Sequence, residues 1–184
     1  EYMLKRFLDA LTSEIRRRKI LFNSMYVDNI NDYIKVCKNI EAHIESINNR
    51  LKNENRRQLT EEEKYKIRKQ AKNEMLPHLV LVIDEFTELK RFSNESDGVD
   101  FISEITTIAR VGRSLGFHII LISQNIEGAI NDDIRVNTKS RLCLKVATKI
   151  ASKEMIGNDL AASPTMPGNG RGYLLVGTGS RFEY

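Results

Sequence analysis

The chain has 184 residues, of which 41% are hydrophobic and 29% are charged, and its formal net charge is +4. This length and apolar content suffice for one sizeable core, and no apolar run approaches the ~20 residues that a membrane-spanning helix needs. No signal peptide is expected. The two cysteines, Cys37 and Cys143, lack metal-ligand spacing, so we expect reduced thiols. The three histidines are scattered along the sequence and do not indicate a zinc site.

The positive charge is concentrated in the first part of the chain. Residues 1–75 hold 17 Lys and Arg against 12 Asp and Glu, whereas residues 76–184 hold 12 against 13. The densest basic cluster is Arg16 to Lys19. Such a flank has two interpretations: it contacts nucleic acid or acidic lipid, or it is the solvated face of a helix.

The first 75 residues are predicted to be helical. Apolar residues recur at helical spacing at Leu4, Phe7, Leu8, Leu11 and Ile15, and again at Ile40, Ile44, Ile47 and Leu51. Thr60 and Glu63 have the spacing of a capping box, so a helix should run from about 61 to 74 and stop before Pro77. Segment 36–75 is therefore predicted to be a helical hairpin.

A strand that ends in two acidic residues follows. The five aliphatic residues Leu79–Ile83 are typical of a strand buried on both faces, and Asp84 and Glu85 come directly after it. Open α/β sheets bind ligands at the carboxyl ends of their strands, so a magnesium-nucleotide site is one interpretation. A strand running into a solvated, charged loop is the other.

The rest of the chain alternates between helix and strand patterns. Ile102, Ile105 and Ile108 mark one face of a helix that we expect to end near Gly116. The remaining expected elements are a strand over 117–123, a short helix over 132–135, a strand over 142–146, a helical turn over 152–156 and a strand over 171–177. Strands separated by helices indicate an α/β fold with a parallel or mostly parallel sheet.

Several motifs occur in an order that resembles the FtsK/SpoIIIE-type motor ATPases. They are Leu76-Pro77-His78, the run ending Ile83-Asp84-Glu85-Phe86, the segment ARVGRSLGFH from Ala109 to His118, and Ser123-Gln124 after a second apolar run. Further likeness lies in 14–18, 29–33, 141–146 and 167–177. More narrowly, the pattern is similar to the ATPase modules of type VII (ESX-like) secretion.

The resemblance implies a RecA-like P-loop NTPase core that is only partial. A P-loop needs G-x-x-x-x-G-K-[ST], and no glycine here is followed by lysine. We therefore expect residues 1–184 to be a fragment of one such ATPase domain, without its P-loop portion, with 36–75 as an insertion in it. The insertion either contacts a neighbour or regulator or only stabilises the domain. The chain alone should not hydrolyse ATP.

The resemblance also implies roles for five residues of the site. Asp84 would hold the magnesium of ATP, directly or through water, and Glu85 would orient or deprotonate the attacking water. Gln124 would sense the γ-phosphate or that water. Arg113, or else Arg110, would act as a trans arginine finger in a neighbouring subunit. A simpler interpretation is that these arginines complement the dipole at a helix C-terminus.

Two departures from the family pattern concern catalytic competence. The family commonly has a lysine or arginine and a proline after the sensor, where this chain has Asn125 to Gly128. It also has an Asp-Ser pair where this chain has Ile150 to Ser152. These changes are compatible with a degenerate module that has lost ATPase activity. The intact Asp84-Glu85 pair argues against complete loss of the catalytic residues.

Three functions remain open at this point. The first is a motor module at the cytoplasmic face of the bacterial membrane that drives secretion of small helical-hairpin proteins of the WXG type. Its partners would be other modules or subunits of the same motor, in a hexameric or ring-like assembly. The second is a DNA-translocating motor, and the third is a non-hydrolysing docking module.

Overall fold

The structure is a computed structural model that describes residues 2–73, 75–89, 101–128, 130, 132–168, 170–177 and 180–183. It divides into two compact units. The N-terminal unit comprises Glu1–Leu81 and Ile108–Ile120, and the C-terminal unit comprises Val82–Thr107 and Leu121–Tyr184. In the residues described, no helix is long and apolar enough to cross a membrane.

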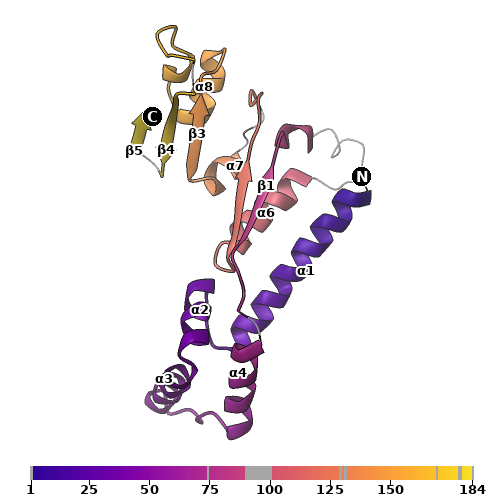
Figure 1. Cartoon of the computed structure of the whole chain (residues 1–184), viewed down its shortest axis with the longest axis vertical. Helices are drawn as coiled ribbons and strands as arrows, with labels where there is room; N and C mark the ends of the chain where they lie inside the picture. The colour runs from indigo at the N-terminus through magenta and orange to yellow at the C-terminus, as the bar shows by residue number, and fades with distance from the viewer. Residues whose placement is uncertain are drawn as a thin grey trace. The chain divides into compact units, whose positions relative to one another are not determined.

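Four helices open the N-terminal unit, where the apolar spacing predicts helical structure without separating the second of them as a helix of its own. They are α1 (Tyr2–Ser24), α2 (Ile30–Lys38), α3 (Ile40–Asn53) and α4 (Glu61–Asn73). Figure 1 shows α2, α3 and α4 gathered beside the C-terminal end of α1. A hydrogen bond of 2.9 Å from Ser24 Oγ to Gln70 Oε1 joins α1 to α4. Phe22 on α1 stacks on Tyr33 of α2, with ring centroids 5.2 Å apart, and both side chains are buried.

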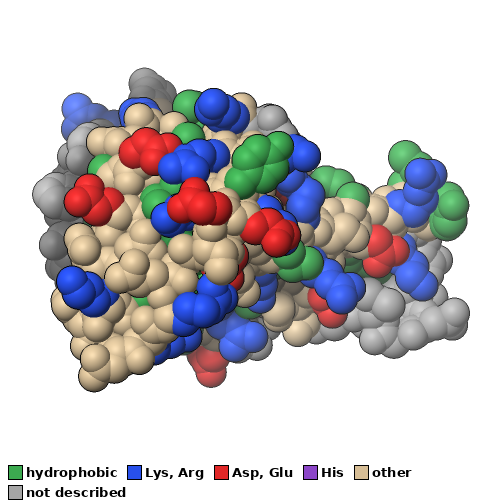
Figure 2. Space-filling model, turned by 90° about the horizontal axis from the view of Figure 1, so that it is seen from below, with side chains coloured by type: hydrophobic (Ala, Val, Ile, Leu, Met, Phe, Trp, Pro, Cys, Tyr) green, Lys and Arg blue, Asp and Glu red, His purple; other side chains and the backbone are tan. Residues whose placement is uncertain are grey.

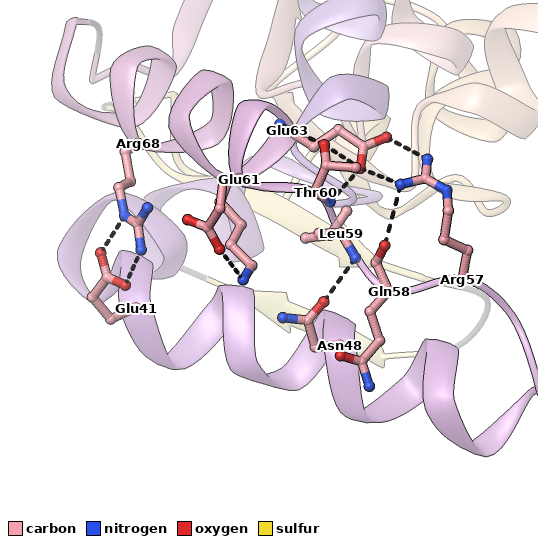
Figure 3. Close-up of polar contacts among 10 residues, drawn as sticks. Glu41, Asn48, Arg57, Gln58, Leu59, Thr60, Glu61, Glu63 and Arg68 are labelled. Carbon is pink, nitrogen blue, oxygen red and sulfur yellow. Dashed lines mark hydrogen bonds and ion pairs between the residues drawn. The ribbon is translucent and has the colours of Figure 1, made fainter.

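Helices α3 and α4 contact each other through an apolar interior and a polar rim, and Figure 3 shows the polar contacts. Ile47 and Ile67 are each at most 4% exposed. At the rim, the guanidinium of Arg68 donates two hydrogen bonds to the Glu41 carboxylate, at 2.7 and 2.8 Å. The two helices lie where the sequence predicts a hairpin. That this segment is an insertion in the family fold stays a prediction.

The start of α4 carries the predicted capping box (Figure 3). The amide of Thr60 donates to Glu63 Oε2 at 2.7 Å, and the amide of Glu63 donates to Thr60 Oγ1 at 3.2 Å. Each side chain thus satisfies a backbone N–H that the first helical turn leaves without a partner. Arg57 donates to the same glutamate at 2.9 Å, which lowers the pKa of Glu63 to about 2.

Strands β1 (Leu79–Ile83) and β2 (Phe117–Leu121) form a two-stranded sheet, and helix α6 (Phe101–Gly112) precedes β2. Main-chain bonds from Leu79 to Gly116 and from Ile122 to Ile83 advance in the same direction, so the pair is parallel, as expected. The prediction that β1 is buried on both faces is wrong. Its burial alternates, because no described residue covers the face that carries Val80, which is 60% exposed.

The C-terminal unit adds a second sheet with helices around it. Its elements are the 3-10 helix η1 (Phe86–Glu88), α7 (Asp132–Asn137), β3 (Ser140–Leu144), α8 (Lys149–Ile156), the 3-10 helix η2 (Leu160–Ala162), β4 (Gly172–Val176) and β5 (Ser180–Glu183). A core packs on this sheet around Cys143, Ile156 and Ala161, each at most 3% exposed. Both cysteines are free thiols, as expected.

This second sheet differs from the expected parallel order. Strand β4 pairs antiparallel with both β3 and β5. The link from β4 to β5 is only residues 177–179, and a connection this short can join antiparallel strands but not parallel ones. The sequence pattern also missed β5, which has only four residues.

Candidate functional site

The candidate site lies in the C-terminal unit, where the chain leaves β1 and β2. The amide of Ile122 donates to the carbonyl of Ile83 at 2.9 Å, and the amide of Phe86 donates to the carbonyl of Ile122 at 3.0 Å. These bonds hold the residues after one strand against the residues after the other. Phe86 is 5% exposed and packs in a cluster with Ile102 and Ile134, which anchors the turn that carries Asp84 and Glu85.

Glu85 occupies an unusual backbone conformation, with φ 53° and ψ 53°. This left-handed region is uncommon for a residue with a side chain, so the surrounding contacts must hold it. The carboxylate supplies those contacts. Its Oε1 accepts hydrogen bonds from the hydroxyls of Ser123 and of Thr87, the latter at 2.7 Å, and its Oε2 accepts from the amide of Gln124 at 3.1 Å.

These donors favour the ionised form of Glu85. The Ser123 hydroxyl, then the Thr87 hydroxyl and the Gln124 amide, hold the pKa of this carboxyl below its ordinary value of 4.5. Glu85 is therefore an anion at neutral pH and can only accept hydrogen bonds. A carboxylate has about four acceptor positions, so three donors leave room for a water molecule.

Asp84 differs from its neighbour. Its side chain is exposed at the end of β1 and has no hydrogen bond or ion pair with any residue described. Carboxylate oxygen is the ligand type that magnesium prefers, and magnesium usually keeps several waters and takes only one or two protein carboxylates. Asp84 thus fits such an ion. Within the described ranges, no group of three or more His, Cys, Asp and Glu side chains has the geometry of an all-protein metal site.

The structure brings Gln124 to Glu85 through its main-chain amide, while its side chain is exposed. Arg110 and Arg113 belong to the N-terminal unit. Arg110 lies in the last turn of α6, and Arg113 is the residue after its end, in the turn that leads to β2. Both side chains are exposed and have no hydrogen bond or ion pair with the described part of the chain.

Two residues of this arrangement were not singled out by the sequence. Ser123 and Thr87 both bind Glu85, and their oxygens lie 3.0 Å apart. Ser123 lies in one of the motifs quoted above and Thr87 directly follows another, but their residue type alone does not distinguish them from other hydroxyl residues in loops. The only local signal is that Thr87 lies two residues after Glu85, a spacing that lets a hydroxyl reach back across a turn.

Two of the three histidines, expected to be scattered, are neighbours. His78 Nδ1 lies 2.9 Å from His118 Nε2. His78 directly precedes β1 and His118 is the second residue of the adjacent strand β2. Both are exposed. Among the described residues, neither belongs to a group of three or more His, Cys, Asp and Glu side chains that could hold a metal ion.

Comparison with known proteins places the chain in a family. A sequence model of the FtsK/SpoIIIE family matches residues 2–128, more than half of the chain. The chain belongs to the FtsK/SpoIIIE family. The match includes β1, Glu85 and Gln124, and it also includes the segment predicted to be an insertion.

Curated relatives of this FtsK/SpoIIIE chain are secretion proteins. It is 36% identical over 178 residues to the ESX secretion system protein YukB of Bacillus subtilis (strain 168), covering 97% of this chain and 9% of that protein. It is also 36% identical to the ESX secretion system protein EccC of Geobacillus thermodenitrificans, and 34% identical to the type VII secretion system protein EssC of Staphylococcus aureus. The chain spans about a tenth of the length of these relatives.

Solved structures show the fold class. The cytoplasmic domain of the type VII secretion ATPase EccC of Thermomonospora curvata matches 98% of this chain and 17% of that chain, with a TM-score of 0.67 and 25% identity. The pCW3 conjugation coupling protein TcpA has the same TM-score at 20% identity, over 99% of this chain and 43% of its own. The fold is that of a P-loop ATPase domain, as the sequence predicts.

Proposed function

We propose that this chain is part of an ATP-hydrolysing motor module that drives type VII protein secretion across the bacterial membrane. Family membership and the likeness to ESX and type VII secretion proteins over 97% of the chain support a secretion motor. The observation that carries the catalytic part is the Glu85 carboxylate, held at the end of a parallel strand by Ser123, Thr87 and the Gln124 amide.

In this proposal Glu85 orients the attacking water and accepts a proton from it. The water oxygen bonds to the γ-phosphorus of ATP while the bond from that phosphorus to the leaving ADP oxygen breaks. The ionised state of Glu85 suits this role, since a proton acceptor must be unprotonated before the reaction. Gln124 senses the γ-phosphate or the water from the same strand end.

Asp84 holds magnesium in this proposal, directly or through water. When bound, magnesium neutralises charge on the phosphates. No segment of this chain has the G-x-x-x-x-G-K-[ST] pattern that grips the phosphates, so we propose that another part of the parent protein supplies it. Arg113, or else Arg110, then completes a neighbouring subunit's site as a trans finger.

The partners follow from the same reasoning. We propose other modules or subunits of the motor in a ring-like assembly, small helical-hairpin proteins of the WXG type as cargo, and a place at the cytoplasmic face of the membrane. A DNA-translocating motor of the same family is the alternative that the charge of the N-terminal residues favours. The altered residues at 125–128 and 150–152 favour a non-hydrolysing docking module.

The test uses the full-length parent protein with its other ATPase modules silenced by mutation. Glu85→Gln keeps the shape of the side chain but cannot accept the proton, so turnover should fall by about 100-fold or more while ATP stays bound. The matched control is Glu104→Gln, which changes the same group on the exposed surface of α6. If the Glu85→Gln variant hydrolysed ATP at this module's site at the wild-type rate, Glu85 would not be the residue that activates the water.

A further inference from the structure

The Ser123 hydroxyl links the Glu85 carboxylate to the loop after β2. Besides binding Glu85 Oε1, Ser123 Oγ lies 3.0 Å from the main-chain oxygen of Asn125. It also lies 3.0 Å from Thr87 Oγ1, which binds the same carboxylate oxygen. One hydroxyl thus contacts the candidate water-activating group, a second hydroxyl and the backbone of the following loop.

A count of protons shows how these contacts fix Glu85. Ser123 and Thr87 each carry one hydroxyl proton, and the ionised carboxylate of Glu85 carries none. Both protons can point at Glu85 Oε1, while the Gln124 amide donates to Oε2. The two oxygens are then held from different sides, which restricts rotation of the carboxylate about its terminal bond.

The far end of the same loop is bound to helix α8. Glu127 accepts a hydrogen bond from Thr148 Oγ1, and Thr148 is the N-cap of α8. The amide of Gly128 donates to both carboxylate oxygens of Glu154, on the same helix, at 3.2 Å. Residues 123–128 therefore span from the Glu85 carboxylate to α8 by contacts within the C-terminal unit.

We propose that Ser123 is a positioning residue that orients the Glu85 carboxylate toward the attacking water, and that α8 sets the position of Ser123 through loop 123–128. This inference rests on the proposed function of Glu85. It adds that the catalytic rate depends on Ser123 and Glu127, two residues to which the proposed function gives no direct role in ATP hydrolysis. Misplacing a reacting group by about 1 Å costs on the order of 100-fold in rate, so loss of one of three hydrogen bonds should be measurable.

The first arm of the test measures ATP turnover of the full-length parent protein with its other modules silenced. Ser123→Ala should lower kcat about 10-fold or more and leave KM for ATP within about threefold, because the phosphates are bound elsewhere. Ser123→Thr keeps the hydroxyl and should recover most of kcat. Thr87→Val, which removes the second hydroxyl at nearly constant shape, gives an independent measure if the alanine variant does not fold.

Three outcomes would overturn the inference. In the first, Ser123→Ala (or Thr87→Val, where the alanine variant does not fold) has the wild-type kcat while Glu85→Gln is inactive, which rules out the positioning role and leaves the proposed function standing. In the second, KM rises as much as kcat falls and Ser123→Thr gives no recovery, which indicates a merely structural role. In the third, Glu85→Gln is fully active, which removes the proposed function together with the inference.

The second arm tests the link to α8. Glu127→Ala removes the acceptor of the Thr148 hydrogen bond, whereas Glu127→Gln keeps an oxygen in its place. The alanine change should lower kcat and the glutamine change should not. If both sites act through one loop, the effects of Ser123→Ala and Glu127→Ala should be less than additive in the double variant. A wild-type kcat in Glu127→Ala, or strictly additive effects of the two substitutions in the double variant, would show that α8 does not set the position of Ser123.

Discussion

Nη1 of Arg18 lies 2.7 Å from the main-chain oxygen of Leu115 and so joins α1 to the turn between α6 and β2. The Arg18 side chain is 1% exposed, and its Nε donates to Glu14, one turn earlier on α1, at 2.8 Å. Its guanidinium also lies 5.0 Å from the centroid of the Phe117 ring. This buried contact holds the turn that carries Arg113.

Arg18→Met should destabilise the fold strongly. The substitution fills most of the volume but leaves the carbonyl of Leu115 without its donor and removes one partner of Glu14. Leaving the buried carbonyl of Leu115 without a donor costs about 1–3 kcal/mol. Arg17→Met is the matched control, since this neighbour binds the same glutamate but is 43% exposed, and it should cost about 1 kcal/mol at most. Urea unfolding measures both, and equal losses would contradict the assignment.

The same cluster should make stability depend on acid pH. The Arg17 guanidinium, followed by that of Arg18, lowers the pKa of Glu14 from 4.5 to about 2. The stabilisation is therefore complete above pH 4.5 and is lost as the pH falls toward 2, at most about 3 kcal/mol in total. Unfolding free energies measured between pH 6 and pH 2 should show this loss. Glu14→Gln should have a shallower slope, and an identical slope would exclude Glu14 as its source.

Features set by neighbours in sequence could be predicted. The capping box of Thr60 and Glu63 depends on four consecutive residues, and the acidic strand end at Asp84 and Glu85 can be recognised from seven consecutive residues. Short segments of this kind do not determine which residues of two strands pair with each other. The bond from Ser123 to Glu85 joins residues 38 positions apart, so Ser123 could not be assigned before β1 and β2 were paired.

The cluster Arg16 to Lys19 shows the same limit for charge. The sequence allows a solvated helix face or a patch for nucleic acid or lipid. The structure instead buries Arg18 against the α6–β2 turn and pairs Arg17 with Glu14. Helical spacing alone cannot single out Arg18, because the residue that it contacts lies 97 positions away.

The arginine finger is a prediction about assembly. Arg113→Ala should leave the folded subunit nearly unchanged, since an exposed side chain without partners among the described residues contributes little to stability. It should lower the ATPase activity that appears only when full-length subunits associate. Mixing Arg113→Ala subunits with Glu85→Gln subunits should restore part of the turnover, because a trans finger allows one complete site at a mixed interface.

The control for that mixture is the same experiment with Arg110→Ala. Arg110 lies three residues earlier, in the last turn of α6, and is also exposed. If turnover recovers only in the mixture that contains Arg110→Ala, Arg110 rather than Arg113 is the arginine finger. Absence of recovery with either arginine would leave both as cations that complement the helix dipole.

The last prediction separates protein cargo from DNA. A motor that tracks duplex DNA neutralises several phosphates, so its affinity falls steeply with salt. Residues 76–184, which hold the candidate site, have 12 basic against 13 acidic residues. On the face shown in Figure 2, Lys and Arg are interspersed with Asp and Glu rather than gathered in one strip. We therefore expect weak, salt-sensitive DNA binding and no stimulation of the motor's ATPase by DNA.

A helical peptide from a secreted WXG-type protein should stimulate the ATPase instead, by laying its apolar face in a groove of the parent protein. The measurement compares turnover of the full-length motor near physiological salt with duplex DNA, with this peptide, and with a peptide of the same composition in scrambled order. The scrambled peptide loses the apolar face but keeps the charge, so it controls for non-specific attraction. Strong stimulation by DNA and none by the peptide would favour the DNA-translocating motor over the secretion motor. The motor would then recognise its cargo by the charge of the phosphates and not by an apolar helix face.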